Sequence, residues 1–120
     1  MYCLDTYALI EIALGNPKFS FLLTQDVVIP ATTLAEFFWV LLRDKNKEEA
    51  EHWSAKLLPL TKPISPQLLL NAQQFRYDEK KHDLSFFDAV GYTFAQEQKS
   101  VFVTGDKEFK GRKGVRFIQK

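Results

Sequence analysis

Four acidic residues stand beside apolar segments of this chain, where an ionised side chain is costly unless its charge is compensated. They are Asp5, Glu36, Asp88 and Asp106. Asp5 ends the short apolar run at residues 2–4, and Asp106 comes shortly after the apolar run at residues 101–103. Carboxylates in such places are paired, used as helix caps or bound to a metal ion. Carboxylate oxygens suit hard divalent cations, so four of them suggest a shared metal site.

Helix capping offers a purely structural explanation for each acid. Residues 33–36 match the capping-box pattern, in which Glu36 would bond to a backbone amide at the helix start. Ser85 and Asp88 show a looser form of the same pattern. Asp5 and Asp106 each precede a predicted helix and could cap it. Taken one at a time, capping explains each acid as well as a metal site does, or better.

The elements around the acids are predicted to alternate between strands and helices. Strands are expected over residues 2–5, 26–30, 60–64, 100–104 and 115–119. Helices are expected over residues 6–14, 19–23, 31–42, 46–58, 85–98 and 106–110, and from residue 65 to the polar stretch at 78–83. This alternation predicts an α/β fold with a central parallel sheet flanked by helices.

A parallel sheet would bring the four acids to one place. Ligands bind such sheets in the crevice at the carboxyl ends of the strands. Asp5 and Asp106 follow strands at that edge, and Glu36 and Asp88 lie early in helices that start there. Four converging carboxylates repel one another unless cations neutralise them, so a metal site explains the set better than four separate caps.

Composition and charge indicate one domain that spans residues 1–120. Apolar residues make up 46% of the chain, enough for a hydrophobic core. Lys and Arg total 16 against 15 for Asp and Glu, so nucleic-acid binding would need a local basic patch. Cys3 is the single cysteine, which excludes an intrachain disulfide and a thiolate zinc site. Neither a signal peptide nor an apolar run of roughly 20 residues occurs, so we expect a cytoplasmic protein without membrane contact.

The helix expected over residues 31–42 has more apolar surface than one neighbour would cover. Its main stripe consists of Leu34, Phe37, Phe38, Leu41 and Leu42, spaced as on one face of a helix. Trp39 and Val40 lie outside that stripe. We therefore expect a second copy of the chain to cover them in a homodimer.

Four short motifs resemble those of the PIN-domain nucleases, and in particular the VapC-like toxins of toxin–antitoxin pairs. Residues 3–6 are similar to a strand that ends in Leu-Asp-Thr, and residues 33–37 to a helix with an early Glu. Residues 84–89 are similar to Leu-Ser-x-x-Asp-Ala, and residues 103–109 to a strand followed by Thr-x-Asp-x-x-Phe. The motifs occur in order over nearly the whole chain.

The resemblance implies a five-stranded fold and a Mg²⁺- or Mn²⁺-dependent endoribonuclease with an RNA substrate. The catalytic and metal-binding residues carried over are Asp5, Glu36, Asp88 and Asp106, with Thr6 and Thr104 as supporting hydroxyls. Asp5 and Asp88 are the best candidates for direct ligands. The resemblance also implies a homodimer and a cognate antitoxin protein. Such chemistry needs no histidine, and we expect His52 and His82 to lie in solvent.

Basic residues cluster in the sequence beside two of the acids, where they could hold an RNA backbone. The candidates are Lys80, Lys81, Lys107, Lys110, Arg112 and Lys113. Ordinary solvated loops explain these residues equally well.

Other function classes compete with the metal-dependent ribonuclease. A haloacid-dehalogenase-like phosphatase needs a second Asp two residues after the first, where this chain has Tyr7. A flap nuclease carries helical insertions for which 120 residues leave no room. A free-standing RNA-processing PIN nuclease, or a degenerate PIN-like module that binds without cutting, stays open as an alternative.

Overall fold

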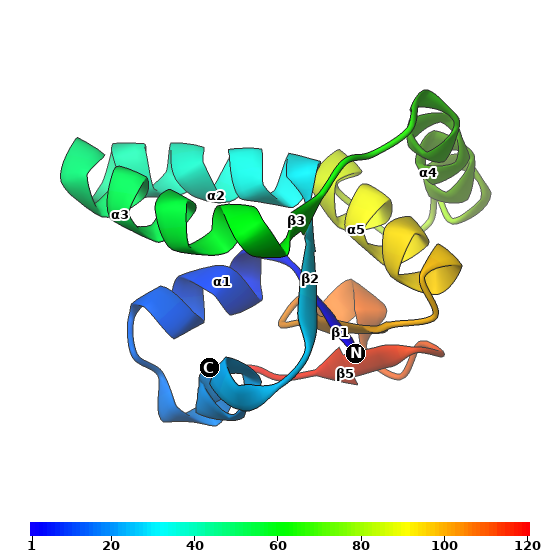
Figure 1. Ribbon diagram of the computed structural model, residues 1–120. Helices are drawn as coiled ribbons and strands as arrows, with labels where there is room; N and C mark the ends of the chain where they lie inside the picture. Colours follow the sequence, from blue (N-terminus) through cyan, green and yellow to red (C-terminus); the bar gives the residue numbers. More distant parts are fainter.

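Strand β1 (Tyr2–Leu4) lies at the centre of a parallel sheet, between β2 (Val27–Pro30) and β4 (Val101–Thr104). β3 (Thr61–Lys62) extends the sheet beyond β2, and β5 (Val115–Phe117) extends it beyond β4. The strand order is therefore β3-β2-β1-β4-β5, and all four pairings are parallel. This computed structural model describes residues 1–120 and confirms the predicted α/β fold (Figure 1).

Helices connect the strands. The α-helices are α1 (Thr6–Ala13), α2 (Ala31–Asp44), α3 (Lys47–Leu57), α4 (Pro66–Asp78) and α5 (Phe86–Glu97). Short 3₁₀ helices are η1 (Pro17–Thr24), η2 (Leu58–Leu60) and η3 (Lys107–Phe109). None of the helices combines the length and the apolar character that crossing a lipid bilayer requires.

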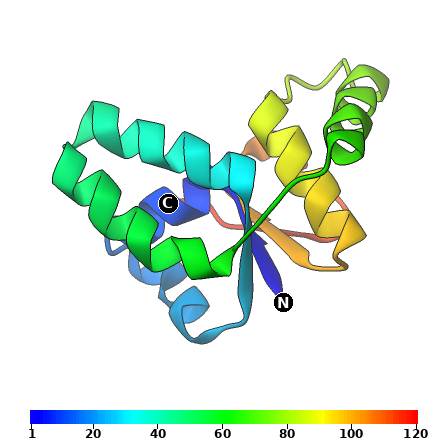
Figure 2. The same cartoon turned by 45° about the horizontal axis from the view of Figure 1, so that its top comes forward.

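Two helical layers cover the two faces of the sheet, because successive residues of a strand point to opposite faces. Pairs of consecutive buried residues in three strands illustrate this alternation. Cys3, Val28 and Phe102 pack with α4 and α5, whereas Leu4, Ile29 and Val103 pack with α1, η1, α2 and α3. Figure 2 shows α4 and α5 on one side of the strands and α2 and α3 on the other. Cys3 is fully buried, as expected of a small apolar side chain.

Two elements differ from the sequence-based expectation. The strand expected over residues 60–64 is limited to Thr61–Lys62, because Pro63 follows it and cannot donate a ladder hydrogen bond. The helix expected over residues 19–23 is the longer 3₁₀ helix η1, which begins at Pro17 behind an Asn16 cap. Neither difference moves a residue at the carboxyl edge of the sheet.

The apolar surface of α2 is only partly covered within one chain. Phe37 and Leu41 are buried, but Trp39 is 59% exposed and Leu42 is 39% exposed. A single chain therefore leaves Trp39 uncovered, and its burial by a second copy stays a prediction.

Candidate active site

The four acids converge on one pocket at the carboxyl edge of the sheet, with a volume of about 550 Å³. Asp5 follows β1, Asp106 follows β4, and the other two acids lie on α2 and α5. Besides Asp5, Glu36, Asp88 and Asp106, the pocket is lined by Thr6, Tyr7, Ser85, Gly105, Lys107 and Gln119. The predicted convergence of four distant segments is thus present in the structure.

Asp5 is both a helix cap and a pocket residue. Its Oδ1 accepts a hydrogen bond of 2.8 Å from the backbone amide of Ala8 and so caps α1. The carboxyl group is almost completely buried, and burial raises its pKa to about 7. Hydrogen bonds from Thr104 and Ala8 act in the opposite direction, and the charges of Glu36 and Asp106 raise the pKa further. A group so placed binds either a proton or a cation near neutral pH.

Asp88 occupies the first turn of α5 without capping it. Ser85 is the cap, since its Oγ accepts a 3.1 Å hydrogen bond from the amide of Asp88. The Asp88 carboxyl faces the pocket, where burial raises its pKa to about 8. The charge of Asp5, a hydrogen bond with Asp106 and the charges of Asp106 and Glu36 add to this rise. The pKa of Asp88 therefore reflects mutual repulsion among the acids as well as burial.

Asp106 is fixed by its own turn. Its Oδ1 accepts a 3.0 Å hydrogen bond from the amide of Glu108, which caps η3 as expected. Its amide donates to the Oγ1 of Thr104 over 3.1 Å. Thr104 is fully buried and also acts to lower the pKa of Asp5, so its hydroxyl influences both acids that follow β1 and β4.

Glu36 does not act as a cap, and the capping-box reading of residues 33–36 is wrong. The helix begins at Ala31, with Pro30 as its N-cap and no side-chain cap bond. Thr33 is therefore already inside the first turn, where it is buried. The carboxylate of Glu36 instead accepts a hydrogen bond from the hydroxyl of Thr6. Both predicted hydroxyl residues, Thr6 and Thr104, thus contact predicted acids.

The donor set fits a hard divalent cation, although the acids are not arranged around one. No three acidic, histidine or cysteine side chains already form a group that could hold a metal ion. Burial and the charges of Asp5, Asp106 and Glu36 instead raise the pKa of Asp88. All the converging donors are carboxylate oxygens, however, which are the ligands that Mg²⁺ and Mn²⁺ prefer.

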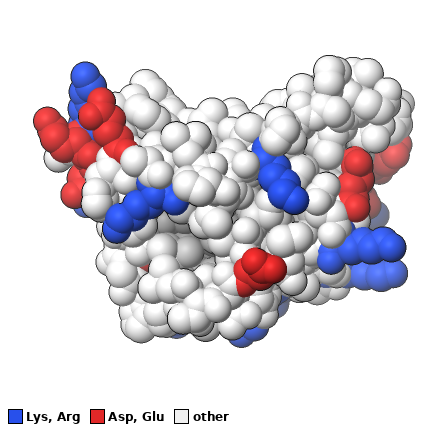
Figure 3. Space-filling view, viewed as in Figure 1, with Lys and Arg blue, Asp and Glu red and all other residues white.

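The basic residues proposed as RNA contacts lie in different surroundings in the structure. Lys107 lines the acidic pocket. Lys80 lies over the ring of Tyr77 and Lys110 over the ring of Phe117, at 4.9 and 5.6 Å from the ring centres. Lys81 and Lys113 are exposed. On the face drawn in Figure 3, Lys and Arg form small separate groups rather than one basic surface.

Arg112 is engaged within the protein. Its Nη1 lies 3.1 Å from Oε1 of Glu79, and its side chain is only 20% exposed. The guanidinium group also lies within 5.9 Å of the ring centres of Phe75, Tyr92 and Phe109. These contacts occupy a guanidinium group that was one of the candidates for RNA contact.

The expectation that His82 lies in solvent is only partly confirmed. Its Nδ1 lies 2.8 Å from Oε2 of Glu108, and its side chain is 35% exposed. This pair could not be predicted from local sequence, because the two residues are 26 positions apart and His82 follows two lysines. His52, by contrast, is exposed as expected.

Tyr7 and Gly105 are pocket residues that the sequence reasoning did not single out. A β-carbon at Gly105 would collide with the ring of Tyr7, so only glycine fits against that ring. Tyr7 follows Asp5 and Thr6 on the first turn of α1, and Gly105 directly precedes Asp106. Their position next to two of the motifs was the signal that could have identified them.

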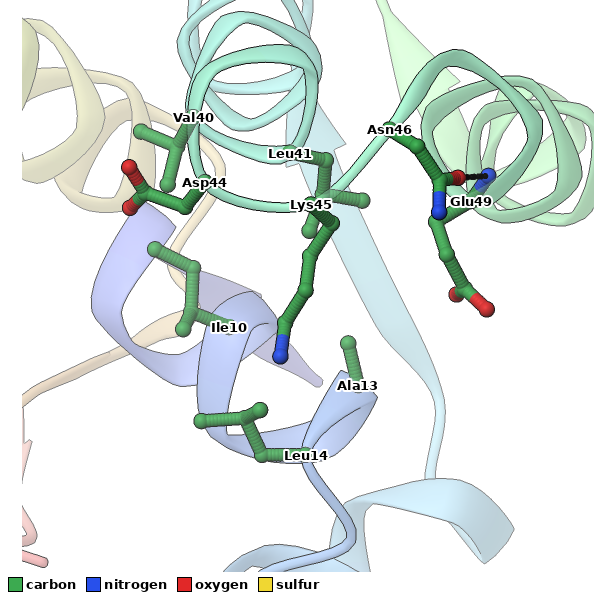
Figure 4. A pocket seen from close by; sticks show the side chains of 9 residues that line it. All are labelled: Ile10, Ala13, Leu14, Val40, Leu41, Asp44, Lys45, Asn46 and Glu49. Atoms are coloured by element: carbon green, nitrogen blue, oxygen red, sulfur yellow. Dashed lines mark hydrogen bonds between the residues drawn. The ribbon is translucent and has the colours of Figure 1, made fainter.

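Another hollow, between α1, α2 and the start of α3, has a different character (Figure 4). Its floor is apolar, and the Lys45 side chain extends across it toward α1. Asn46 points away and caps α3 by accepting a 2.8 Å hydrogen bond from the amide of Glu49. Because no set of carboxylates converges there, the hollow lacks the chemistry of the acidic pocket.

Comparison with known proteins identifies the family. The family model described as PIN domain matches residues 2–114. The chain therefore belongs to the PIN domain family, which confirms the resemblance based on the four motifs. No curated protein sequence matches the chain significantly.

Solved structures of toxins and toxin–antitoxin complexes share this fold. A toxin–antitoxin complex from Klebsiella pneumoniae aligns with a TM-score of 0.76 and 19% identity, over 100% of this chain and 100% of that chain. VapC20 from Mycobacterium tuberculosis, a sarcin-ricin loop cleaving toxin, aligns with a TM-score of 0.74 and 16% identity, over 82% and 84% of the two chains. VapBC-1 from nontypeable Haemophilus influenzae aligns with a TM-score of 0.71 and 20% identity, over 98% and 96%. At these sequence identities, the similarity to these structures shows a shared fold alone.

Proposed function

We propose that residues 1–120 form one nuclease domain that hydrolyses RNA phosphodiester bonds with Mg²⁺ or Mn²⁺ and serves as the toxin of a toxin–antitoxin pair. One observation carries the proposal: Asp5, Glu36, Asp88 and Asp106 line a single pocket of a PIN domain. The raised pKa values of Asp5 and Asp88, about 7 and about 8, support it. Groups with strongly shifted pKa values concentrate at functional sites.

Asp5 and Asp88 would hold the cation directly, with Glu36 and Asp106 beside them. When bound, a divalent ion supplies an activated water and neutralises charge on the leaving oxygen. The chain's own residues orient this set. Thr104 accepts a hydrogen bond from the Asp106 amide, and Thr6 donates one to Glu36. Lys107, on the pocket wall, would contact a substrate phosphate.

The assignment as a toxin rests on the shared fold with VapC20 and with toxin–antitoxin complexes. It implies an RNA substrate, a protein antitoxin, a homodimer and a cytoplasmic location. A free-standing RNA-processing nuclease would use the same four acids without the antitoxin. A non-catalytic binding module would keep the pocket but neither bind a metal ion for catalysis nor cut RNA.

The test compares charge removal inside and outside the pocket. Asp5→Asn and Asp88→Asn keep the side-chain shape and remove one charge each. We expect both variants to lose RNA cleavage and Mn²⁺ binding in calorimetric titrations, whereas their metal-free melting temperature holds or rises. Glu97→Gln is the matched control, because Glu97 is an exposed acid at the far end of α5. Wild-type protein that neither binds Mn²⁺ nor cuts RNA, or an Asp5→Asn variant with wild-type cleavage, would rule out the proposal.

A further inference from the structure

Two loops beside the acidic pocket are joined by side chains that the proposed chemistry does not use. The first loop, residues 79–85, connects α4 to α5 and leads to Ser85 and Asp88. The second, residues 105–114, connects β4 to β5 and begins next to Asp106. Glu79 and His82 come from the first loop, and Glu108 and Arg112 from the second. We call these four residues the loop cluster.

His82 makes the shortest contact of the loop cluster. Its Nδ1 lies 2.8 Å from Oε2 of Glu108, so this ring nitrogen donates to the carboxylate when it carries hydrogen. Its Nε2 lies 3.9 Å from Oε2 of Glu79. The backbone amide of His82 donates to the carbonyl of Glu79 over 2.8 Å, which fixes the turn that carries the imidazole. His82 thus lies between carboxylates from both loops.

Arg112 makes a second connection between the loops. Its guanidinium group bonds to Glu79 over 3.1 Å and stacks near rings from α4, α5 and η3. Its Nε is buried and has no hydrogen-bond partner, so packing against these rings and the bond to Glu79 hold the group in place. The position of Glu79, and hence of the turn that carries His82, is therefore set from the second loop.

The loop cluster continues directly into the acidic pocket. On one side, the amide of Glu108 donates to Oδ1 of Asp106. On the other side, three residues after His82, Ser85 caps α5 by accepting from the amide of Asp88. Hydrogen bonds therefore link Asp106 to Glu108 and Glu108 to His82. His82 in turn belongs to the loop that leads along the chain to Ser85 and Asp88.

We propose that His82 and Glu108 are positioning residues, which set Asp88 against Asp106 by joining the two loops from outside the pocket. This proposal rests on the proposed function, since it assigns the loop cluster to the same four-acid site. Outer partners of this kind orient ligands, and their loss typically reduces metal affinity by about 10–100-fold. An ordinary half-exposed ion pair would instead contribute little to stability and nothing to the site.

The first measurement is Mn²⁺ affinity, determined by calorimetric titration of the full chain well below its melting temperature. His82→Leu removes the donor, and we expect Mn²⁺ binding to weaken by about 10-fold or more. His82→Asn places an amide near the position of Nδ1, and we expect it to restore affinity to within about threefold of wild type, since the donor returns. His52→Leu is the matched control, because His52 is exposed on α3, and it should leave Mn²⁺ affinity unchanged.

The second measurement asks whether the two residues act through one bond. Glu108→Ala should weaken Mn²⁺ binding to a similar degree as His82→Leu. The double variant should be no weaker than the worse single variant, because both changes break the same contact. Full additivity of the two losses, or wild-type Mn²⁺ affinity in a folded His82→Leu protein, would overturn the proposal.

Hydrogen exchange of the metal-free protein separates this proposal from the proposed function. We expect His82→Leu to reduce amide protection in residues 82–88 and 105–110 together, while α2 and α3 keep theirs. Retained protection in both segments overturns the positioning role, whatever the wild-type protein does with Mn²⁺. If His82→Leu reduces protection in both segments but wild-type protein binds no Mn²⁺, the loop connection is supported and the nuclease assignment is refuted.

Discussion

The hydroxyl of Thr6 donates a hydrogen bond to Oε1 of Glu36 and joins the first turn of α1 to the second turn of α2. The two residues are 30 positions apart, and each belongs to a different acidic motif. Glu36 points into the acidic pocket, and nothing else in the structure is hydrogen-bonded to its carboxylate. The position of this acid therefore depends on Thr6.

Replacing Thr6 tests this dependence. Thr6→Val keeps the branched shape and removes the donor, and we expect a loss of about 1.5 kcal/mol in the free energy of unfolding, because a hydrogen bond to a charged group is lost. Thr6→Ser keeps the hydroxyl and should lose much less. Urea denaturation of both variants provides the measurement, and equal losses in the two would mean that the hydroxyl does not restrain Glu36.

The pH dependence of stability should report the repulsion in the pocket. Burial and neighbouring charges raise the pKa of Asp5 to about 7 and that of Asp88 to about 8. In the unfolded chain an Asp titrates near pH ~3.9. The folded state therefore binds protons more tightly, and the free energy of unfolding falls as pH rises from about 4 to about 8. We expect metal-free protein to melt at a higher temperature near pH ~5.5 than near pH ~8.5.

Two controls make this pH prediction specific. The double variant Asp5→Asn, Asp88→Asn should lose most of the decline between the two pH values, because Asn does not titrate. Saturating Mn²⁺ should raise the melting temperature of wild-type protein more at the higher pH, where the carboxylates are ionised. A decline of the same size in the double variant would assign the pH dependence to other groups.

Gly105 should tolerate no side chain, because the Tyr7 ring lies against its α-carbon. Its backbone is not in the left-handed region, so the restriction is one of space. We expect Gly105→Ala to destabilise the protein by about 1–3 kcal/mol through overpacking. Tyr7→Ala should relieve that clash, so the double variant should lose less stability than the sum of the two single losses. Additive losses in thermal denaturation would contradict the close contact.

Trp39 provides the test of the homodimer. It is 59% exposed on α2, on an apolar face that a second copy would bury. We expect sedimentation at micromolar concentration to show a dimer, and Trp39→Glu to shift it to a monomer. Leu70→Glu is the control, because Leu70 is equally prominent on α4 with 64% exposure and should leave the dimer intact. A monomeric wild-type protein would count decisively against this assembly.

The antitoxin prediction concerns the charge of the acidic pocket. Four carboxylates form a receptor for an Arg or Lys side chain, since a guanidinium group binds carboxylates through two hydrogen bonds. We expect purification from the native host to recover a small partner protein that inhibits RNA cleavage, and Asp88→Asn to weaken its binding. Repeated recovery of the chain alone, without toxicity on expression, would favour a free-standing RNA-processing nuclease.

The parts of the fold that the sequence predicted are those set by local chemistry. The β-branched run in β2, the apolar spacing along α2 and Ser65-Pro66 at the start of α4 each determine an element within a few residues. Convergence of the acids followed from the parallel sheet, because its carboxyl ends share one edge. These predictions required no knowledge of which distant side chains meet.

The contacts that the sequence did not predict depend on pairs of residues far apart in the chain. Residues 33–36 match the capping-box pattern, but the helix begins earlier, directly after Pro30. Glu36 therefore does not lie at the helix start, and its carboxylate bonds to Thr6 instead. His82 looked solvated because its neighbours are lysines, while its partner Glu108 lies in another loop. Arg112 looked like an RNA contact because it lies in a basic stretch, while three aromatic rings and Glu79 surround it.

The central position of β1 in the sheet determines when the acidic pocket is completed during synthesis. β1 is synthesised well before its partner β4, in which Val101 pairs with Tyr2. The pairing cannot form before β4 has been synthesised, and closing so long a loop is slow and entropically costly even then. Asp106 follows that strand, and the pocket stays incomplete until it emerges. Under the proposed function, the growing chain is harmless to the RNA that surrounds it until Asp106 has been added.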